Sequence, residues 1–406
     1  MSLDETAQID GNWLVIVTLI AIWTSMTVLA RRDLVKVSVR ARRIAVTLAV
    51  GVTAALLTWS VWSRPQPQTS DLAQIWAGAG ALLHHQNPYE AIGPGRAFNW
   101  PYPLLYPMTA ILTLIPLAWM PLRWVDPVFV GLGFGLFTYA VTMRRLVTPA
   151  LMALVSLAAL MTLQTSQWSL LLTGAALVPG FGWLLVAKPT IGMALFAAFP
   201  RWKTAIGCSA LLILSVIIRP TWMSDWRATF SSAPHVVAPI MRAGGPLVLL
   251  ALLKWKRADA RLLLGLACVP HTTVPYETIP LFLIPQTWPQ AWSLWSLGLL
   301  AYAGQWATGP YPSQAAYWES GARWIVVLLY LPCLGMILSR PNVWSDSYPD
   351  PPSPAPTPDS GRTYDVSTAG RRFLLVKRSA NRVGTPQIVV VQNWFEELKR
   401  LAPATR

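Results

Sequence analysis

Long apolar runs separated by short clusters of charge are the feature that most constrains this chain. Of its 406 residues, 54% are hydrophobic and only 12% are charged, against roughly a quarter charged in an average soluble domain. A single soluble core could not hide that much apolar surface, whereas a lipid bilayer accepts it. The 22 tryptophans also indicate a membrane protein, because an amphipathic indole is most stable near the lipid headgroups. We therefore expect an all-α polytopic membrane protein.

The net charge of +15 raises the question of nucleic-acid binding. The basic residues, however, lie in short connecting loops and in the C-terminal tail, and no amphipathic face gathers them. That distribution is typical of cytoplasmic loops under the positive-inside rule. The expected partners are therefore membrane lipids, and we expect no nucleic-acid partner.

The order of apolar and basic segments predicts how the chain threads the membrane. Six basic residues lie between positions 31 and 43, after the apolar run Trp13–Ala30, so this loop should be cytoplasmic and the N-terminus outside. Ile44–Trp62 returns the chain outward, and Ser63–Pro103 is then extracytoplasmic. A hairpin near 148–164 is expected on the outer side. Further spans, giving about 11–13 membrane segments in all, are expected at 104–120, 127–143, 168–178, 181–188, 190–200, 204–219, 245–254, 262–270, 277–288, 291–304 and 323–338.

Composition changes after the last apolar run. We expect an additional N-terminal helix and basic loop at 1–43, a membrane domain at 44–340, a Pro-rich linker at 341–362 and a cytoplasmic tail at 363–406. The tail predicts strands at 372–377 and 387–392 and a short helix at Asn393–Leu401, so it is a small α+β segment. It resembles the last blade of a TolB-like β-propeller. One blade cannot bury both of its faces, so we assign it no activity.

Acidic residues on the expected outer face are few, which limits where carboxylate chemistry can occur. They are Asp71, Glu90, Asp225, Glu277 and Glu319. Asp71 opens residues 71–85, whose apolar positions recur with helical spacing. Thr69 and Ser70 supply a helix start, and the helix dipole should keep the Asp71 carboxylate ionised. The alternative is that Asp71 only stabilises the start of this amphipathic outer-loop helix.

The stretch that follows Asp71 carries a family resemblance. Asn87-Pro-Tyr-Glu and Phe98-Asn-Trp-Pro-Tyr-Pro lead into an apolar segment that ends at Pro121. Residues 71–121 resemble glycosyltransferase family 87, the polyprenyl-phosphate-mannose-dependent mannosyltransferases of the GT-C superfamily. More weakly, the resemblance extends over about residues 44–338.

Three later segments carry that extension. Gln167 lies in a segment similar to the family's Gly-Gln-x-Asn, with Ser166 and Ser169 in place of Gly and Asn. Ala187-Lys-Pro resembles its Lys-Pro element. Residues 270–277 resemble a Pro-His-x-x-x-Tyr-Asp element, with Glu277 in place of Asp.

The resemblance implies a GT-C-like helical bundle in a bacterial cytoplasmic membrane and a role for each candidate residue. A polyprenyl-phosphate sugar, of which mannose is the first choice, would donate its sugar to an extracytoplasmic glycolipid or glycan acceptor. Asp71 would take the proton from the acceptor hydroxyl in a single displacement that inverts the anomeric carbon. The residues expected to bind substrate are Lys188, His271, Glu277, Gln167, Tyr89 and Arg96.

Lys188 and His271 would offset the charge on the leaving phosphate, with Arg96 and Arg219 as reserves. Glu277 and Gln167 would orient sugar hydroxyls, and Tyr89 would stack on a sugar. The alternatives are snorkelling for Lys188 and ordinary polar contacts for the others.

No cofactor is expected. The sequence contains no Asp-x-Asp and no His/Asp cluster with ligand spacing, so we expect no metal. Two other functions fit the same composition: a membrane transporter or flippase of a lipid-linked or small solute, and a non-catalytic relative of the enzyme. The absence of an internal repeat argues against the transporter. The sugar, the acceptor and the oligomeric state stay open.

Overall fold

The computed structural model describes residues 38–62, 70–232, 236–270 and 274–344, together with the backbone of three strands in the tail. The chain divides into two units, Met1–Pro351 and Pro352–Arg406, and each is described by itself. The division falls within the expected linker at 341–362. The predicted span Trp13–Ala30 and the predicted tail helix Asn393–Leu401 lie outside the described residues.

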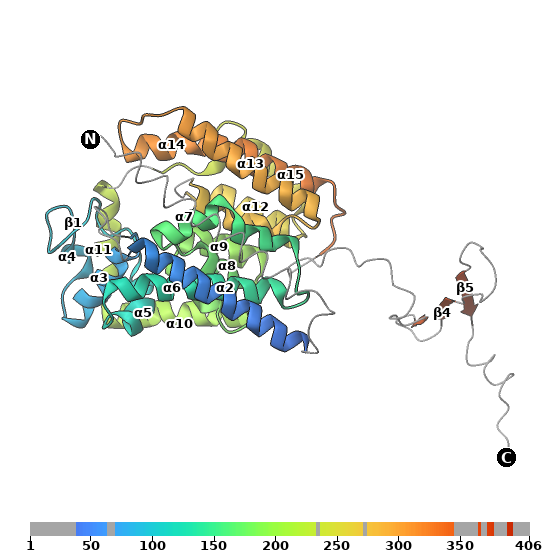
Figure 1. The fold of residues 1–406 in the computed structure, drawn as a ribbon, viewed down its shortest axis with the longest axis horizontal. Helices are drawn as coiled ribbons and strands as arrows, with labels where there is room; N and C mark the ends of the chain where they lie inside the picture. The colour runs from blue at the N-terminus through green and yellow to red at the C-terminus, as the bar shows by residue number, and fades with distance from the viewer. Residues whose placement is uncertain are drawn as a thin grey trace, which may run out of the picture. The chain divides into compact units, whose positions relative to one another are not determined.

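The first unit is built mainly from α-helices (Figure 1) and short 3-10 helices, for which we use the label η. Its first half contains α2 (Val39–Trp62), α3 (Ala73–Leu83), α4 (Pro88–Ala91), β1 (Ile92–Gly93), β2 (Phe98–Asn99), α5 (Met108–Leu114), η1 (Ile115–Leu117), α6 (Leu122–Thr142), η2 (Pro149–Val155), α7 (Leu157–Thr165), α8 (Ser169–Leu177), η3 (Gly182–Ala187) and α9 (Pro189–Ala198). Its second half contains α10 (Trp202–Ile218), α11 (Trp222–Thr229), η4 (Phe230–Ser232), η5 (Pro239–Met241), η6 (Gly245–Lys254), α12 (Ala258–Cys268), η7 (Pro275–Leu283), α13 (Trp288–Ala307), α14 (Gln314–Ile325), η8 (Val326–Tyr330, a π-helix) and α15 (Leu331–Leu338).

The second unit contains one antiparallel sheet with the strand order β3 (Tyr364–Val366), β4 (Arg372–Val376), β5 (Ile388–Gln392). Phe373 pairs with Val391, and Leu375 pairs with Val389 and with Tyr364. The two strands predicted in the tail are therefore present, and Tyr364–Val366 adds a third.

The expected all-α class holds for the described part of the first unit. Three helical stretches there are long and apolar enough to cross a membrane: Val39–Val61, Leu122–Thr142 and Ala316–Leu338. Trp202–Ile218 followed by Trp222–Thr229, which is bent by 95°, makes a fourth candidate if the pair is one span. Of the other predicted spans in the described residues, α13 (Trp288–Ala307) has 20 residues but is not apolar enough, and the rest are shorter helices. The described residues therefore show fewer full-length spans than the 11–13 expected.

At one end of the bundle, arginine side chains donate hydrogen bonds to the last carbonyl groups of helices. We call it the Arg261 end. Arg43 Nε donates to Thr142 O at the end of α6 (2.9 Å), and Arg201 Nη1 to Leu177 O at the end of α8 (3.0 Å). Arg261 donates to Ala197 O and Ala198 O at the end of α9 (2.9 and 3.1 Å). The last carbonyls of a helix lack partners within it, and a cation there also opposes the negative end of the helix dipole. Arginines that the charge pattern places in loops thus lie in α2, before α10 and in α12, and there they bond the ends of neighbouring helices.

The opposite end of the bundle carries α3, α4, β1 and α11, which lie together on the left of Figure 1. We call it the Asp71 end. At this end, Asn87 Nδ2 donates to Asp225 Oδ2 (3.2 Å), and Trp226 Nε1 donates to Leu105 O (2.9 Å). These bonds join the segment after α3 to α11, which lies far along the chain.

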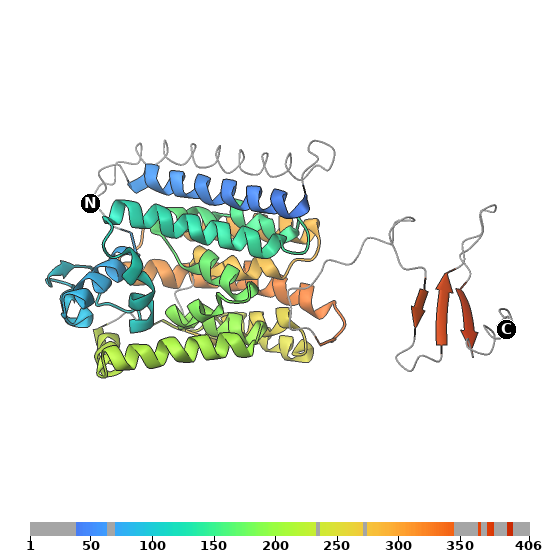
Figure 2. The same cartoon turned by 90° about the horizontal axis from the view of Figure 1, so that it is seen from below.

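The threading predicted for 104–165 is wrong in two places. Helices α2 and α6 run antiparallel side by side (Figure 2): Trp59 stacks on Trp124 (centroids 6.4 Å apart) at the Asp71 end, and Arg43 reaches Thr142 at the other. Residues 104–121 therefore begin and end at the Asp71 end and are no full crossing. In place of the one-sided hairpin predicted near 148–164, η2 and α7 lead from the Arg261 end to Thr165.

The predicted spans 104–120 and 127–143 put Arg123 on the cytoplasmic side and the pair Arg144 and Arg145 on the outer side, and for this pair that is contrary to the positive-inside rule. The structure places this pair beyond the end of α6, at the Arg261 end. The two errors compensate, so every later segment keeps its predicted direction.

Glycines bring α2 and α6 into close contact. A Cβ added to Gly131 would lie 2.8 Å from Gly51 O and 3.0 Å from Ala55 Cβ. A Cβ added to Gly51 would lie 2.9 Å from Gly131 O. Backbone on each side blocks any larger residue, so the packing of these helices depends on both glycines.

We predict that Gly131→Ala lowers the stability of the folded protein by about 1–3 kcal/mol, because the methyl group forces the two backbones apart. Gly80→Ala is the matched control: it is the same change inside α3, where an added Cβ meets nothing within 4 Å. The control should gain about 0.5–1 kcal/mol from the lower chain entropy. Thermal unfolding of the two purified variants tests this, and equal midpoints would refute the packing argument.

Candidate functional site

The candidate site is built from four chain segments, each at the start of a helix. Asp71 precedes α3, Gln167 precedes α8, Lys188 directly precedes α9, and Glu277 lies in the first turn of η7. All four helices begin at the Asp71 end. The positive ends of their dipoles therefore point toward the same region, which favours negative charge there.

Gln167 links the carboxylate to the cation. Its Nε2 donates a short hydrogen bond to Asp71 Oδ2, and its Oε1 lies 3.5 Å from Lys188 Nζ. Lys188 Nζ in turn donates to Glu277 Oε1 at 2.6 Å. The result is one chain of contacts, Asp71–Gln167–Lys188–Glu277, between residues as much as 206 positions apart, from 71 to 277.

Lys188 is held in a largely dry, aromatic environment. Its side chain is 14% exposed and that of Glu277 is 1% exposed. The rings of Tyr276 and Tyr106 lie 5.4 and 6.0 Å from the ammonium group, close enough for cation–π attraction. Glu277 Oε2 has no hydrogen-bond partner in the part of the chain that the structure describes. A buried acceptor without a donor is costly, so this oxygen is available to a group that brings one.

Asp71 is half-buried, and its surroundings correct the expectation that the helix dipole governs its charge. Burial raises the pKa of Asp71 to about 6, with Lys188 and the Gln167 hydrogen bond opposing the rise. Helix α3 starts only at Ala73, and no side chain caps it. The Asp71 carboxylate is turned to Gln167 and does not accept from the helix. Above about pH 6 it is mainly ionised and can accept a proton.

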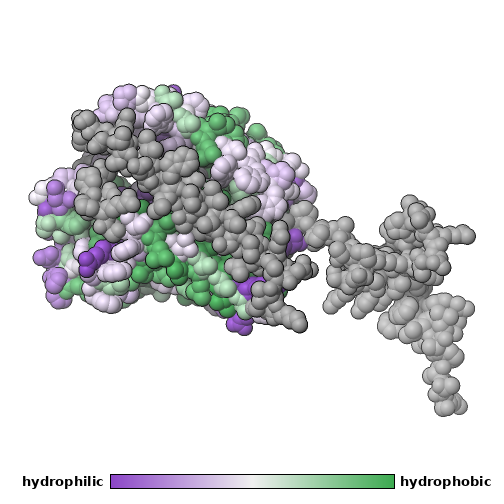
Figure 3. Space-filling view, in the orientation of Figure 1, coloured by the Kyte–Doolittle hydropathy of each residue, from purple (hydrophilic) through white to green (hydrophobic). Residues whose placement is uncertain are grey.

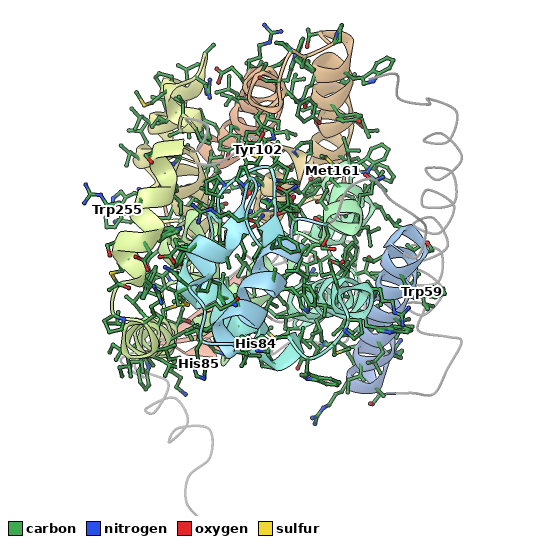
Figure 4. All side chains as sticks on the ribbon, turned by 90° about the vertical axis from the view of Figure 1, so that its left-hand side faces the viewer. Trp59, His84, His85, Tyr102, Met161 and Trp255 are labelled. Carbon is green, nitrogen blue, oxygen red and sulfur yellow. The ribbon has the colours of Figure 1, made fainter. Side chains whose placement is uncertain are left out.

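The helix after Asp71 is shorter than predicted and more deeply buried. Leu72, Ile75 and Ala79 recur with helical spacing and are buried, but Gln74 and Gly78 on the opposite edge of the helix are buried too. Figure 4 looks onto this end, with α3 near the centre of the face and His84 and His85 beyond the end of that helix.

Two predicted binding residues lie outside the contact chain. Tyr89 is buried, and its hydroxyl donates to Tyr106 O (3.2 Å). Arg96 Nη1 donates to Tyr89 O (2.6 Å), so both stabilise the segment after α3. The reserve residue Arg219 pairs with Asp225 at 3.0 Å. His271 lies outside the described residues.

Asp126 is a carboxylate at this end that the sequence reasoning missed. The predicted span 104–120 puts it in a cytoplasmic loop, between that span and the next. The structure places it in α6 with 2% exposure, and Ser70 Oγ donates to its Oδ1 at 2.6 Å. Applying the charge rule to Arg144 and Arg145 would have placed it correctly.

Ser166 has a left-handed backbone, with φ 53°. Glycine adopts this conformation without steric cost, whereas a residue with a Cβ is strained there by roughly 1–2 kcal/mol. The turn lets α7 end at Thr165 and sets Gln167 against Asp71. This is the position at which the family resembled has Gly.

Comparison with known proteins identifies no relative. No family model, no curated protein and no solved structure matches the chain. The described residues contain no group of three or more His, Cys, Asp or Glu side chains that could hold a metal ion.

We predict that Lys188→Met lowers stability by about 3–5 kcal/mol, because it leaves the Glu277 carboxylate buried without its cation. The double variant Lys188→Met/Glu277→Leu should lose less than the sum of the two single changes. The control pair is Arg219 and Asp225, whose side chains are 26% and 23% exposed. Arg219→Met should cost about 1 kcal/mol or less. Equal losses from Lys188→Met and Arg219→Met, measured by thermal unfolding, would contradict the assignment.

Proposed function

We propose that this chain is a membrane glycosyltransferase that moves a hexose, mannose in the first instance, from a polyprenyl-phosphate donor to a glycolipid or glycan acceptor. The observation that carries the proposal is the contact chain Asp71–Gln167–Lys188–Glu277. It joins a carboxylate that can accept a proton to a cation that can bind phosphate.

The surface supports a multi-pass protein of the cytoplasmic membrane with this site on the outer side. Where the described residues are visible in Figure 3, apolar side chains lie over the middle of the bundle and hydrophilic side chains at its left-hand end. Exposed tryptophans lie near both ends: Trp59, Trp119, Trp124 and Trp306 toward Asp71, and Trp202, Trp255, Trp292 and Trp344 toward Arg261. Such belts match the two headgroup regions of a bilayer. Basic loops at the Arg261 end then fit the cytoplasmic side.

The phosphate of the donor would bind beside Lys188, at the starts of α8, α9 and η7. As the bond between the anomeric carbon and the phosphate oxygen breaks, negative charge grows on the phosphate, and a fixed cation in a dry site stabilises it. Glu277 holds Lys188 at 2.6 Å. The phosphate would therefore share or replace this partner, which makes Glu277 the counter-ion of Lys188 and revises its expected role of orienting the sugar.

Asp71 would act as the general base. The acceptor hydroxyl oxygen attacks the anomeric carbon while its proton passes to the Asp71 carboxylate, and polyprenyl phosphate leaves with the electron pair of the broken bond. The attack comes from the face opposite the phosphate, so the configuration inverts. Gln167 fixes the orientation of the carboxylate.

The backbone at Ser166 supports the family resemblance. The family has Gly at this position, and here the backbone is left-handed, which is the conformation that favours Gly. The exchange of the family's Asp for Glu277 adds one methylene, and the longer side chain reaches Lys188.

We predict that Asp71→Asn lowers the rate of sugar transfer by roughly 10²–10⁴-fold, because the amide cannot accept the hydroxyl proton. The assay follows radiolabelled mannose from polyprenyl-phosphate mannose into membrane glycolipid, using purified protein in proteoliposomes. Glu90→Gln is the control. Its exposed carboxylate contacts Asn87 (2.8 Å) and lies in the first turn of α4, so its rate should stay near that of the wild type.

Equal turnover by the wild type and Asp71→Asn would remove Asp71 from the mechanism. Movement of a labelled lipid across the membrane without glycosylated product would favour the transporter.

A further inference from the structure

Ser70 and Asp126 form a second buried contact directly behind the proposed base. Ser70 is 2% exposed and Asp126 is also 2% exposed, and their oxygens are 2.6 Å apart. Ser70 adjoins Asp71 in the chain, whereas Asp126 belongs to α6. The bond therefore ties the residue next to the base to a long helix.

The helix that carries Asp126 is firmly placed. Trp124 stacks on Trp59 of α2, and the glycine contact described above brings α2 and α6 together. The backbone of Asp71 is fixed from another side, since its N–H donates to Thr165 O (3.2 Å). Asp71 is thus held by α6 through Ser70, by α7 through Thr165, and by the turn before α8 through Gln167.

A carboxylate is an unexpected choice for a purely structural contact here. The salt bridges of the described residues do not include Asp126, and burial of an acid without a cation is unfavourable. The Ser70 hydroxyl precedes α3, where a serine commonly caps a helix by accepting from a backbone N–H. Instead α3 has no side-chain cap.

We propose that Asp126 is a positioning residue for the transfer reaction: by holding the Ser70 hydroxyl it fixes the turn that carries Asp71 and aims the Asp71 carboxylate at the acceptor. The inference rests on the proposed function. A displacement of about 1 Å in a reacting group can lower a rate by about a hundredfold. The contact therefore acts on the rate of the chemical step, while the affinity for the donor depends on Lys188.

Three variants test this in the labelled-mannose assay. Ser70→Ala removes one atom, Asp126→Ala removes the acceptor, and Asp126→Asn keeps an oxygen that can accept from Ser70. We expect kcat to fall about 10–100-fold in the two alanine variants with the KM for polyprenyl-phosphate mannose unchanged. Asp126→Asn should retain kcat within roughly threefold of the wild type. The Ser70→Ala/Asp126→Ala double variant should be no slower than the slower single variant.

A contact that only stabilises the fold would lower the unfolding midpoint without this pattern in kcat and KM, and the conservative variant would not restore the rate. Wild-type kcat in folded Ser70→Ala and Asp126→Ala would overturn the positioning role while leaving the proposed function intact. A wild-type protein that transfers no sugar would overturn the proposed function, and the positioning role with it.

Discussion

Helix ends impose the main constraint on this molecule. Each helix leaves backbone carbonyls without partners at one end and N–H groups at the other, and an apolar surrounding makes such orphans costly. At one end of the bundle, the side chains of Arg43 in α2, Arg201 before α10 and Arg261 in α12 satisfy the carbonyls of α6, α8 and α9. The same charges that favour a cytoplasmic position thus also determine where the helices stop.

The opposite end of the bundle carries helix N-termini, whose free N–H groups favour negative charge. Helices α3, α8, α9 and η7 begin there, and their N-termini create a region that favours anions. Asp71 and Glu277 supply negative charge to it, and Lys188 is connected to Asp71 through Gln167 and to Glu277 by a direct ion pair. A site with one buried cation, one unsatisfied carboxylate oxygen and converging helix starts is suited to a ligand that brings both a phosphate and hydroxyl groups.

Several parts of this arrangement could be predicted from the sequence because they depend on local chemistry. Apolar runs gave the order of nearly all helices, and α2 and α10 match the predicted segments within a few residues. The scarcity of acidic residues directed attention to Asp71 and Glu277. Gln167 and Lys188 followed from the resemblance, and the structure joins all four in one chain of contacts.

What could not be predicted depends on contacts between distant segments. Arg123 and the pair Arg144–Arg145 flank the same apolar segment, and the packing of α2 against α6 shows that the pair lies at the end of the bundle that carries Arg43. The same packing brings Asp126 to Ser70, a bond across 56 positions that no local pattern reveals. Tyr89 and Arg96 were chosen for their residue type, and in the structure they stabilise a loop.

We propose that Lys188 and its neighbours receive the phosphate of a prenyl-linked sugar. Photo-crosslinking tests this on the wild-type protein in proteoliposomes, with a polyprenyl-phosphate mannose that carries a diazirine beside the phosphate, followed by mass spectrometry. We expect labelled peptides from the segments around Asp71, Gln167, Lys188 and Glu277, with labelling that unmodified donor competes away. Label confined to the Arg261 end, or label that the donor does not displace, would contradict it.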